Sequence, residues 1–139
     1  LDGPAPAFAT IDVSFISLKL ILPTLAELLQ SGGGTVALIK PQFEAGREQV
    51  GKSGVVRDPG VHESVLIEVL AHAEKLGFRL QGLTYSPITG GEGNIEFLAY
   101  WRLEAKASGT LEDESSPDSV PSLVRSVVDE ASNAFHRKG

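Results

Sequence analysis

Three charged side chains stand at the ends of apolar, strand-like runs and are the strongest candidates for chemistry. Asp12 interrupts the apolar run 8–16 directly after residues 8–11, and Lys40 directly follows the run 35–39. Glu96 lies near the start of a later strand candidate. Open α/β sheets bind ligands outside the carboxyl ends of their parallel strands, and a charge that ends a buried strand costs free energy unless it is paired or solvated. Each residue alone could simply reach water, but together they indicate a ligand-binding site.

The elements that must hold these side chains follow from the apolar spacing. Near-continuous apolar runs are typical of strands in parallel sheets, and apolar residues three and four positions apart are typical of helices. The loop between the last two strands is too short for a crossover helix, so these strands must be antiparallel, which brings Glu96 to the end of the sheet that holds Asp12 and Lys40. We therefore predict an α/β open sheet with one antiparallel strand. The expected order is strand 8–16, helix 18–29, strand 35–39, loop 42–60, helix 61–76, strand 78–85, strand 94–101 and helix 121–135.

Composition excludes several classes of protein. The 139 residues leave room for one core. Cysteine is absent, which excludes disulfides, Cys-ligated zinc and a thiol nucleophile. No apolar run has the length of a membrane span, and a net charge of −6 disfavours a free-standing nucleic-acid binder. We expect a cytoplasmic protein.

The start of the sequence also carries information. The chain contains no Met and begins at Leu1, so we expect a processed or excised piece of a longer protein. The first predicted strand, 8–16, is apolar and has no neighbour to cover its outer edge. We therefore expect that strand to pair with a second copy of the chain or with a preceding segment.

The other chemical candidates are weaker. The residues His62, His72 and His136 lack the spacing of a metal site. The glycines 32–34 precede a strand, which favours a helix cap over a phosphate-binding loop. The loop after the second strand holds basic residues that could contact phosphates or could simply be solvated, namely Arg47, Lys52 and Arg57.

Several motifs together carry a resemblance to a known family. Over roughly residues 5–135, the sequence closely resembles the TlyA family, also called haemolysin A, and the matching motifs occur in the same order. These proteins belong to the FtsJ-like, S-adenosylmethionine-dependent ribosomal RNA 2′-O-methyltransferases. The matching motifs are 12–18, 39–44, 51–59, 86–88 and 93–98.

The resemblance implies a Rossmann-like methyltransferase sheet with helices on both faces, and roles for particular residues. By motif, Asp12, Lys40 and Glu96 match three members of the family's Lys-Asp-Lys-Glu catalytic tetrad, whose first Lys would precede residue 1. Asp12, Val13 and Ser14 would contact the methionine end of the cofactor. The RNA-binding candidates are Arg47, Lys52 and Arg57.

The resemblance also implies a division of the chain. Residues 1–104 would form the C-terminal half of the methyltransferase domain, 105–119 an acidic linker and 120–139 a helix that packs on the same domain. The glycine-rich cofactor loop and the ribose-binding acid would lie in the missing half. The fragment would then be inactive without that half, and its partner in the full-length protein would be ribosomal RNA.

Two questions of function stay open at this point. Lys40 could be the general base for a ribose 2′-hydroxyl, or a cation that orients the hydroxyl and stabilises developing negative charge. Methyl transfer requires no metal. The alternative function is a non-catalytic TlyA-like protein that binds RNA or acts as a haemolysin-type interaction module, although no cationic amphipathic helix supports membrane lysis.

Overall fold

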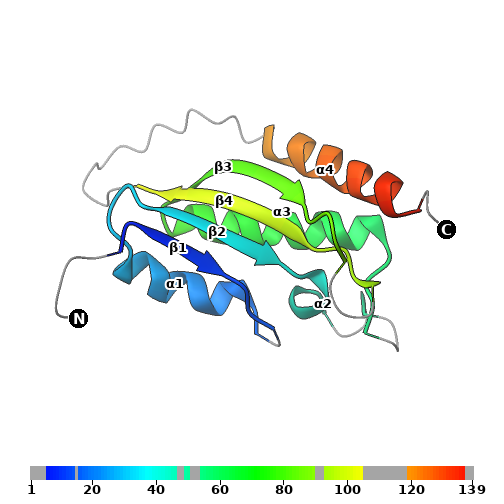
Figure 1. Cartoon of the computed structure of the whole chain (residues 1–139), viewed down its shortest axis with the longest axis horizontal. Coiled ribbons are helices and arrows are strands. Elements are labelled where there is room, and N and C mark those ends of the chain that lie inside the picture. Colours follow the sequence, from blue (N-terminus) through cyan, green and yellow to red (C-terminus); the bar gives the residue numbers. More distant parts are fainter. Residues whose placement is uncertain are drawn as a thin grey trace.

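The strands and helices alternate along the chain largely as the apolar spacing predicts (Figure 1). The computed structural model describes residues 6–14, 16–46, 49–50, 54–89, 93–104 and 119–136. The strands are β1 (Phe8–Ile11), β2 (Gly34–Ile39), β3 (Phe78–Tyr85) and β4 (Phe97–Leu103). The helices are α1 (Leu18–Leu28), α2 (Pro41–Glu44), α3 (Pro59–Lys75) and α4 (Ser119–His136).

The four strands form one sheet in the order β1-β2-β4-β3. β1 and β2 are parallel, whereas β4 runs antiparallel to both of its neighbours. β1, β2 and β3 therefore point the same way, and β4 is inserted between β2 and β3 in the opposite direction. This arrangement confirms the α/β class and the single antiparallel strand.

One face of the sheet is covered by helices and holds the core. Ala37, Phe97, Ala99 and Trp101 are buried on this face, where α1, α3 and α4 contribute apolar side chains to the same cluster. In Figure 1 the strands lie toward the viewer and α3 lies behind them. The resemblance predicts helices on both faces of the sheet; in the part of the chain that the structure describes, α1, α3 and α4 pack on this one face.

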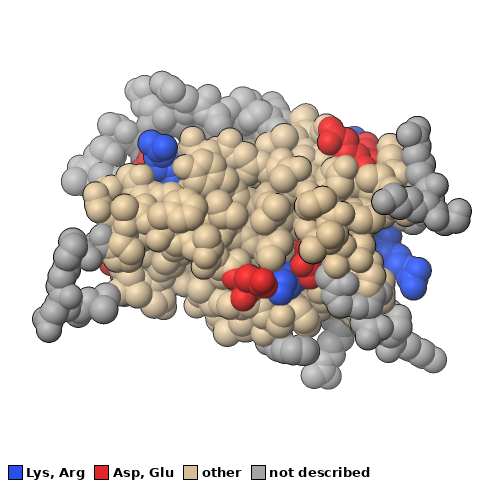
Figure 2. Space-filling model, viewed as in Figure 1, with Lys and Arg blue, Asp and Glu red and all other residues tan. Residues whose placement is uncertain are grey.

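The opposite face of the sheet is more open. Its paired positions carry the half-buried side chains Val36, Leu38, Leu98 and Tyr100, and Phe8 on β1 is 55% exposed. Figure 2, which shows the side that faces the viewer in Figure 1, is largely free of charged atoms across its middle. The middle of this sheet face is thus uncharged and partly apolar, while the exposed Arg102 of β4 lies on the same face toward one end.

Several boundaries differ from the expected ones. β1 ends at Ile11 instead of continuing to residue 16, and the hydroxyl of Ser17 caps the amino end of α1. The expected loop 42–60 contains all but the first residue of α2 and the first two residues of α3, and Pro41 and Pro59 suit the first position of these helices. β4 starts at Phe97 and not at residue 94. The expected linker 105–119 lies outside the described residues, apart from Ser119, which begins α4.

Candidate active site

Asp12 and Lys40 meet at the carboxyl ends of β1 and β2. The Nζ atom of Lys40 lies 2.6 Å from Oδ1 of Asp12 and donates a hydrogen bond of 3.1 Å to Oγ of Ser14. The Lys40 side chain is 12% exposed, whereas that of Asp12 is 66% exposed. The Lys40 side chain is therefore largely buried in the protein, whereas the carboxylate of Asp12 is exposed to solvent.

Glu96 lies across the sheet from Lys40. The register pairs Ile39 of β2 with Phe97 of β4; Lys40 directly follows Ile39 and Glu96 directly precedes Phe97, so both lie just beyond the same end of the two strands. Glu96 is buried at 8% exposure, and its Oε2 accepts a hydrogen bond of 3.3 Å from Nε2 of Gln42. The structure thus joins Lys40 to Asp12 directly, and it links Glu96 to the residue two positions after Lys40.

Strand directions explain why these residues gather. Asp12 and Lys40 follow the carboxyl ends of parallel strands, and Glu96 precedes the amino end of the antiparallel strand between β2 and β3. All three positions therefore lie along one end of the sheet. Figure 2 shows acidic and basic atoms together at the place where β1 and β2 end in Figure 1.

The residues after Lys40 add contacts that the sequence interpretation missed. α2 contains only four residues, yet Gln42 reaches Glu96 and Glu44 reaches the amino end of α1. The signal available in the sequence was their place in the motif 39–44, directly after Lys40. An interpretation of this stretch as loop gave no reason to assign them partners.

Asn94 is a second residue that the sequence interpretation missed. It is buried, accepts a 2.9 Å hydrogen bond from the amide of Val56, and donates a 2.9 Å hydrogen bond to the carbonyl of Gly54. The Nε2 atom of His62 lies 2.9 Å from the Val56 carbonyl. These contacts fasten the segment that precedes α3 to the chain just ahead of Glu96.

The basic candidates are only partly accounted for. Arg57 is exposed and directly precedes Asp58, which caps α3. Arg47 and Lys52 lie outside the described residues. Among the described residues, no group of three or more His, Cys, Asp or Glu side chains could hold a metal ion.

The match to a family model settles the relationship of the chain to known proteins. Residues 2–103 match the model described as FtsJ-like methyltransferase. The chain belongs to this family. The site at the ends of β1 and β2 lies within the matched region.

Individual relatives agree with this assignment. The chain is 50% identical over 135 residues to "Putative rRNA methyltransferase YqxC" from Bacillus subtilis strain 168, covering 96% of the chain and 45% of that protein. It is 39% identical over 105 residues to "16S/23S rRNA (cytidine-2'-O)-methyltransferase TlyA" from Mycobacterium tuberculosis, covering 73% of the chain and 39% of that protein. The resemblance to TlyA proteins is thereby confirmed.

A solved structure shows the same fold. "Putative hemolysin from Streptococcus thermophilus" superposes with a TM-score of 0.83 at 50% identity, covering 96% of this chain and 45% of that one. The chain therefore spans less than half the length of these relatives.

Proposed function

We propose that this chain forms part of an S-adenosylmethionine-dependent ribosomal RNA 2′-O-methyltransferase and supplies the side chains that act on the ribose hydroxyl. The observation that carries the proposal is the Lys40 ammonium beside Asp12 and Ser14 at the ends of two parallel strands. The family match and the rRNA methyltransferase names of two relatives support it. Such an enzyme would work in the cytoplasm, where its RNA substrate is made.

The contacts of Lys40 define what it can do to a hydroxyl group. An ammonium has three N–H donors, and at Lys40 one points to Asp12 and one to Ser14. Among the described residues these two are its polar contacts, and the remaining donor would bind the oxygen of a ribose 2′-hydroxyl. As a cation, Lys40 would orient this oxygen and stabilise the negative charge that grows on it. As a neutral amine, it would instead take the proton as general base.

Asp12 and Glu96 would act through Lys40. Asp12 pairs directly with the ammonium, so it fixes the direction of the remaining donor. Glu96 directly precedes β4 at the end of the sheet where Lys40 follows β2, and it would be positioned by Gln42, which donates a hydrogen bond to it.

The described residues fit one end of S-adenosylmethionine. When bound, this cofactor supplies an electrophilic methyl group. Asp12 and Ser14 are exposed at the carboxyl end of β1, where ligands of such sheets bind, and with Val13 they would hold the amino-acid part of the cofactor. The junctions from β1 to α1 and from β2 to α2 contain no glycine that could form a phosphate-type or adenosine-binding loop.

This partial fit gives a prediction for the 139-residue chain by itself. One strand end buries too little of a ligand of this size for useful affinity, because ligand sites usually enclose 70–90% or more of the ligand surface. We expect no heat of binding when S-adenosylmethionine is titrated into the chain in a calorimeter. A dissociation constant in the micromolar range would show that residues 1–139 already form a complete cofactor site.

Methyl transfer itself is tested with the full-length protein that contains this chain. Purified ribosomal RNA is incubated with the protein and methyl-labelled S-adenosylmethionine, and the RNA is then hydrolysed in alkali. Alkaline cleavage needs a free 2′-hydroxyl, so we expect the label in dinucleotides that resist hydrolysis. Label in mononucleotides would place the methyl group on a base and contradict the 2′-O assignment.

The alternative is a non-catalytic protein that binds RNA or a partner. The hemolysin name of the solved relative motivates it. No helix within the described ranges is long and apolar enough to cross a membrane. RNA binding without any transferred label in the assay above would favour this alternative over the enzyme.

A further inference from the structure

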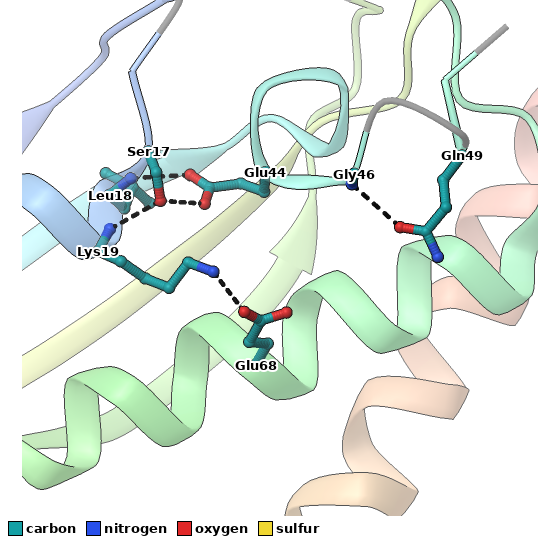
Figure 3. Close-up of polar contacts among 7 residues, drawn as sticks. All are labelled: Ser17, Leu18, Lys19, Glu44, Gly46, Gln49 and Glu68. Atoms are coloured by element: carbon teal, nitrogen blue, oxygen red, sulfur yellow. Dashed lines mark hydrogen bonds and ion pairs between the residues drawn. The ribbon is translucent and has the colours of Figure 1, made fainter.

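Glu44, the last residue of α2, makes contacts that the proposed chemistry does not use. Its Oε1 accepts a 2.6 Å hydrogen bond from the hydroxyl of Ser17, and its Oε2 accepts a 2.8 Å hydrogen bond from the amide of Leu18 (Figure 3). The Ser17 hydroxyl in turn accepts a 3.0 Å hydrogen bond from the amide of Lys19. Ser17 and Glu44 therefore cap the amino end of α1 together.

The carboxylate in this cap is a group that α1 does not supply from its own first turn. The first amides of a helix have no partner within the helix, and a negative charge near them is favourable because of the helix dipole. α1 has no acidic residue in its own first turn. The carboxylate that fills this role comes from α2, 26 positions away from Leu18.

The same two stretches of chain also meet at the candidate active site. Lys40 directly precedes α2 and contacts Asp12 and Ser14, at the start of the connection between β1 and α1. Glu44 ends α2 and contacts Ser17, at the end of that connection. The β1–α1 connection and residues 40–44 thus contact each other at two places, through Lys40 at one and through Glu44 at the other.

We infer that Glu44 is a positioning residue, which holds the β1–α1 connection against α2 and thereby keeps Asp12 and Ser14 within reach of the Lys40 ammonium. Its consequence for catalysis rests on the proposed function. Its consequence for the geometry of Lys40 does not, because Lys40 and its partners are present in this chain.

A purely structural role for Glu44 makes a different prediction. If Glu44 only stabilised α1, its loss would expose Lys19, whose 29% exposed side chain lies in the first turn of α1, as much as it exposes Lys40. If Glu44 positions the connection, its loss changes Lys40 while a lysine elsewhere in the fold keeps its behaviour. Lys75, the last residue of α3, is exposed and serves as that internal reference.

Glu68 offers a matched control variant. It is an exposed carboxylate on α3 that pairs with Lys19 in the first turn of α1 (Figure 3). Glu68→Gln removes a carboxylate contact from the same end of α1. It leaves the contacts of the β1–α1 connection and of α2 in place.

The geometry is tested by amine acylation of the folded chain. The parent, Glu44→Ala, Glu44→Gln and Glu68→Gln are treated briefly with acetic anhydride, and acetylation at each lysine is measured by peptide mass spectrometry. Because a net hydrogen bond is worth about 1 kcal/mol, we expect Lys40 to be acetylated about fivefold faster in Glu44→Ala, relative to Lys75. Glu44→Gln, which keeps one acceptor oxygen, should show a smaller increase, and Glu68→Gln none.

Two results would overturn the inference: an unchanged Lys40 rate in Glu44→Ala, or equal increases at Lys40 and Lys19, both measured relative to Lys75. If circular dichroism shows that Glu44→Ala is unfolded, the isosteric Glu44→Gln is judged by the same criterion. If Glu68→Gln raised the acetylation rate of Lys40 as much as Glu44→Ala does, the assignment would also be contradicted, because Glu68→Gln leaves the contacts of Glu44 with Ser17 and Leu18 in place.

The catalytic consequence is tested separately in the full-length protein. We expect Glu44→Ala to lower kcat for RNA methylation by about fivefold, the same factor as its effect on Lys40, and to leave the KM for S-adenosylmethionine unchanged. An unchanged kcat together with faster acetylation of Lys40 would contradict the catalytic part. Absence of methylation by the parent protein would defeat the proposed function, while the acetylation result would still decide the role of Glu44.

Discussion

At the scale of single residues, the sequence reveals charged side chains more readily than their partners. Asp12 and Lys40 stand out because they end apolar runs, and the structure places their charged atoms 2.6 Å apart. The contacts of Ser14 and Glu44 could not be predicted in this way. They depend on how the chain turns after Ile11 and coils after Lys40, which the apolar pattern does not specify.

Asp12→Asn separates the role of this residue in chemistry from its role in stability. The Asp12 side chain is 66% exposed, and exposed ion pairs contribute at most about 1 kcal/mol to the free energy of unfolding. We therefore expect urea denaturation to show a loss below about 1 kcal/mol.

The same substitution should affect methylation strongly, because it removes the charge that orients the Lys40 ammonium. In the full-length protein we expect kcat to fall by about tenfold or more, a loss typical of groups that orient a catalytic side chain. Asp129→Asn, at an exposed position on α4, is the control and should change neither quantity. A large loss of stability with normal methylation would assign Asp12 a structural role instead.

At the scale of elements, apolar periodicity located the main helices and strands, and β3 matches its expected range at both ends. It failed in the stretch between Lys40 and α3, where few side chains are apolar. There the structure is determined by hydrogen bonds of Gln42, Glu44 and Asn94. Such contacts join residues up to 54 positions apart, so local pattern contains no information about them.

Asn94→Ala tests whether these hydrogen bonds stabilise the segment 54–58, which precedes α3. The substitution would leave the amide of Val56 and the carbonyl of Gly54 without their side-chain partner. A buried polar group that loses its partner costs about 1–3 kcal/mol, and we expect a loss of that size in urea denaturation. Asn133→Ala, at an exposed position on α4, should have little effect; equal losses in the two variants would mean that the contacts of Asn94 contribute nothing specific.

At the scale of the whole molecule, one face of the sheet is packed and the other is open. The sequence predicted that the outer edge of the first strand lacks a neighbour, and β1 does form an edge of the sheet. Phe8 lies on that edge and is 55% exposed. The chain also spans 45% of the length of YqxC. Apolar spacing revealed the edge, but only the burial pattern shows that the neighbouring sheet face is open as well.

We expect the 139-residue chain to self-associate through β1 and this face. Exposed apolar edge strands pair with other chains, and a lysine on such an edge opposes pairing. The mass measured by light scattering should rise with concentration for the parent and stay at one chain for Phe8→Lys. Leu20→Lys, at an exposed apolar position on α1, is the matched control and should associate like the parent. A parent that remains monomeric at high concentration would contradict this expectation.

The central claim is that Lys40 acts on the ribose hydroxyl, and the most direct measurement is the rate of RNA methylation by the Lys40→Met full-length protein. Methionine keeps the length and apolar stem of the side chain but removes its nitrogen, so packing is preserved. Lys75→Met, at the exposed end of α3, is the control, and cofactor binding should be unchanged in both variants. We predict that Lys40→Met lowers kcat by about 10²–10⁴-fold, the usual loss for a proton-transfer group; a rate within about tenfold of the parent would contradict the account.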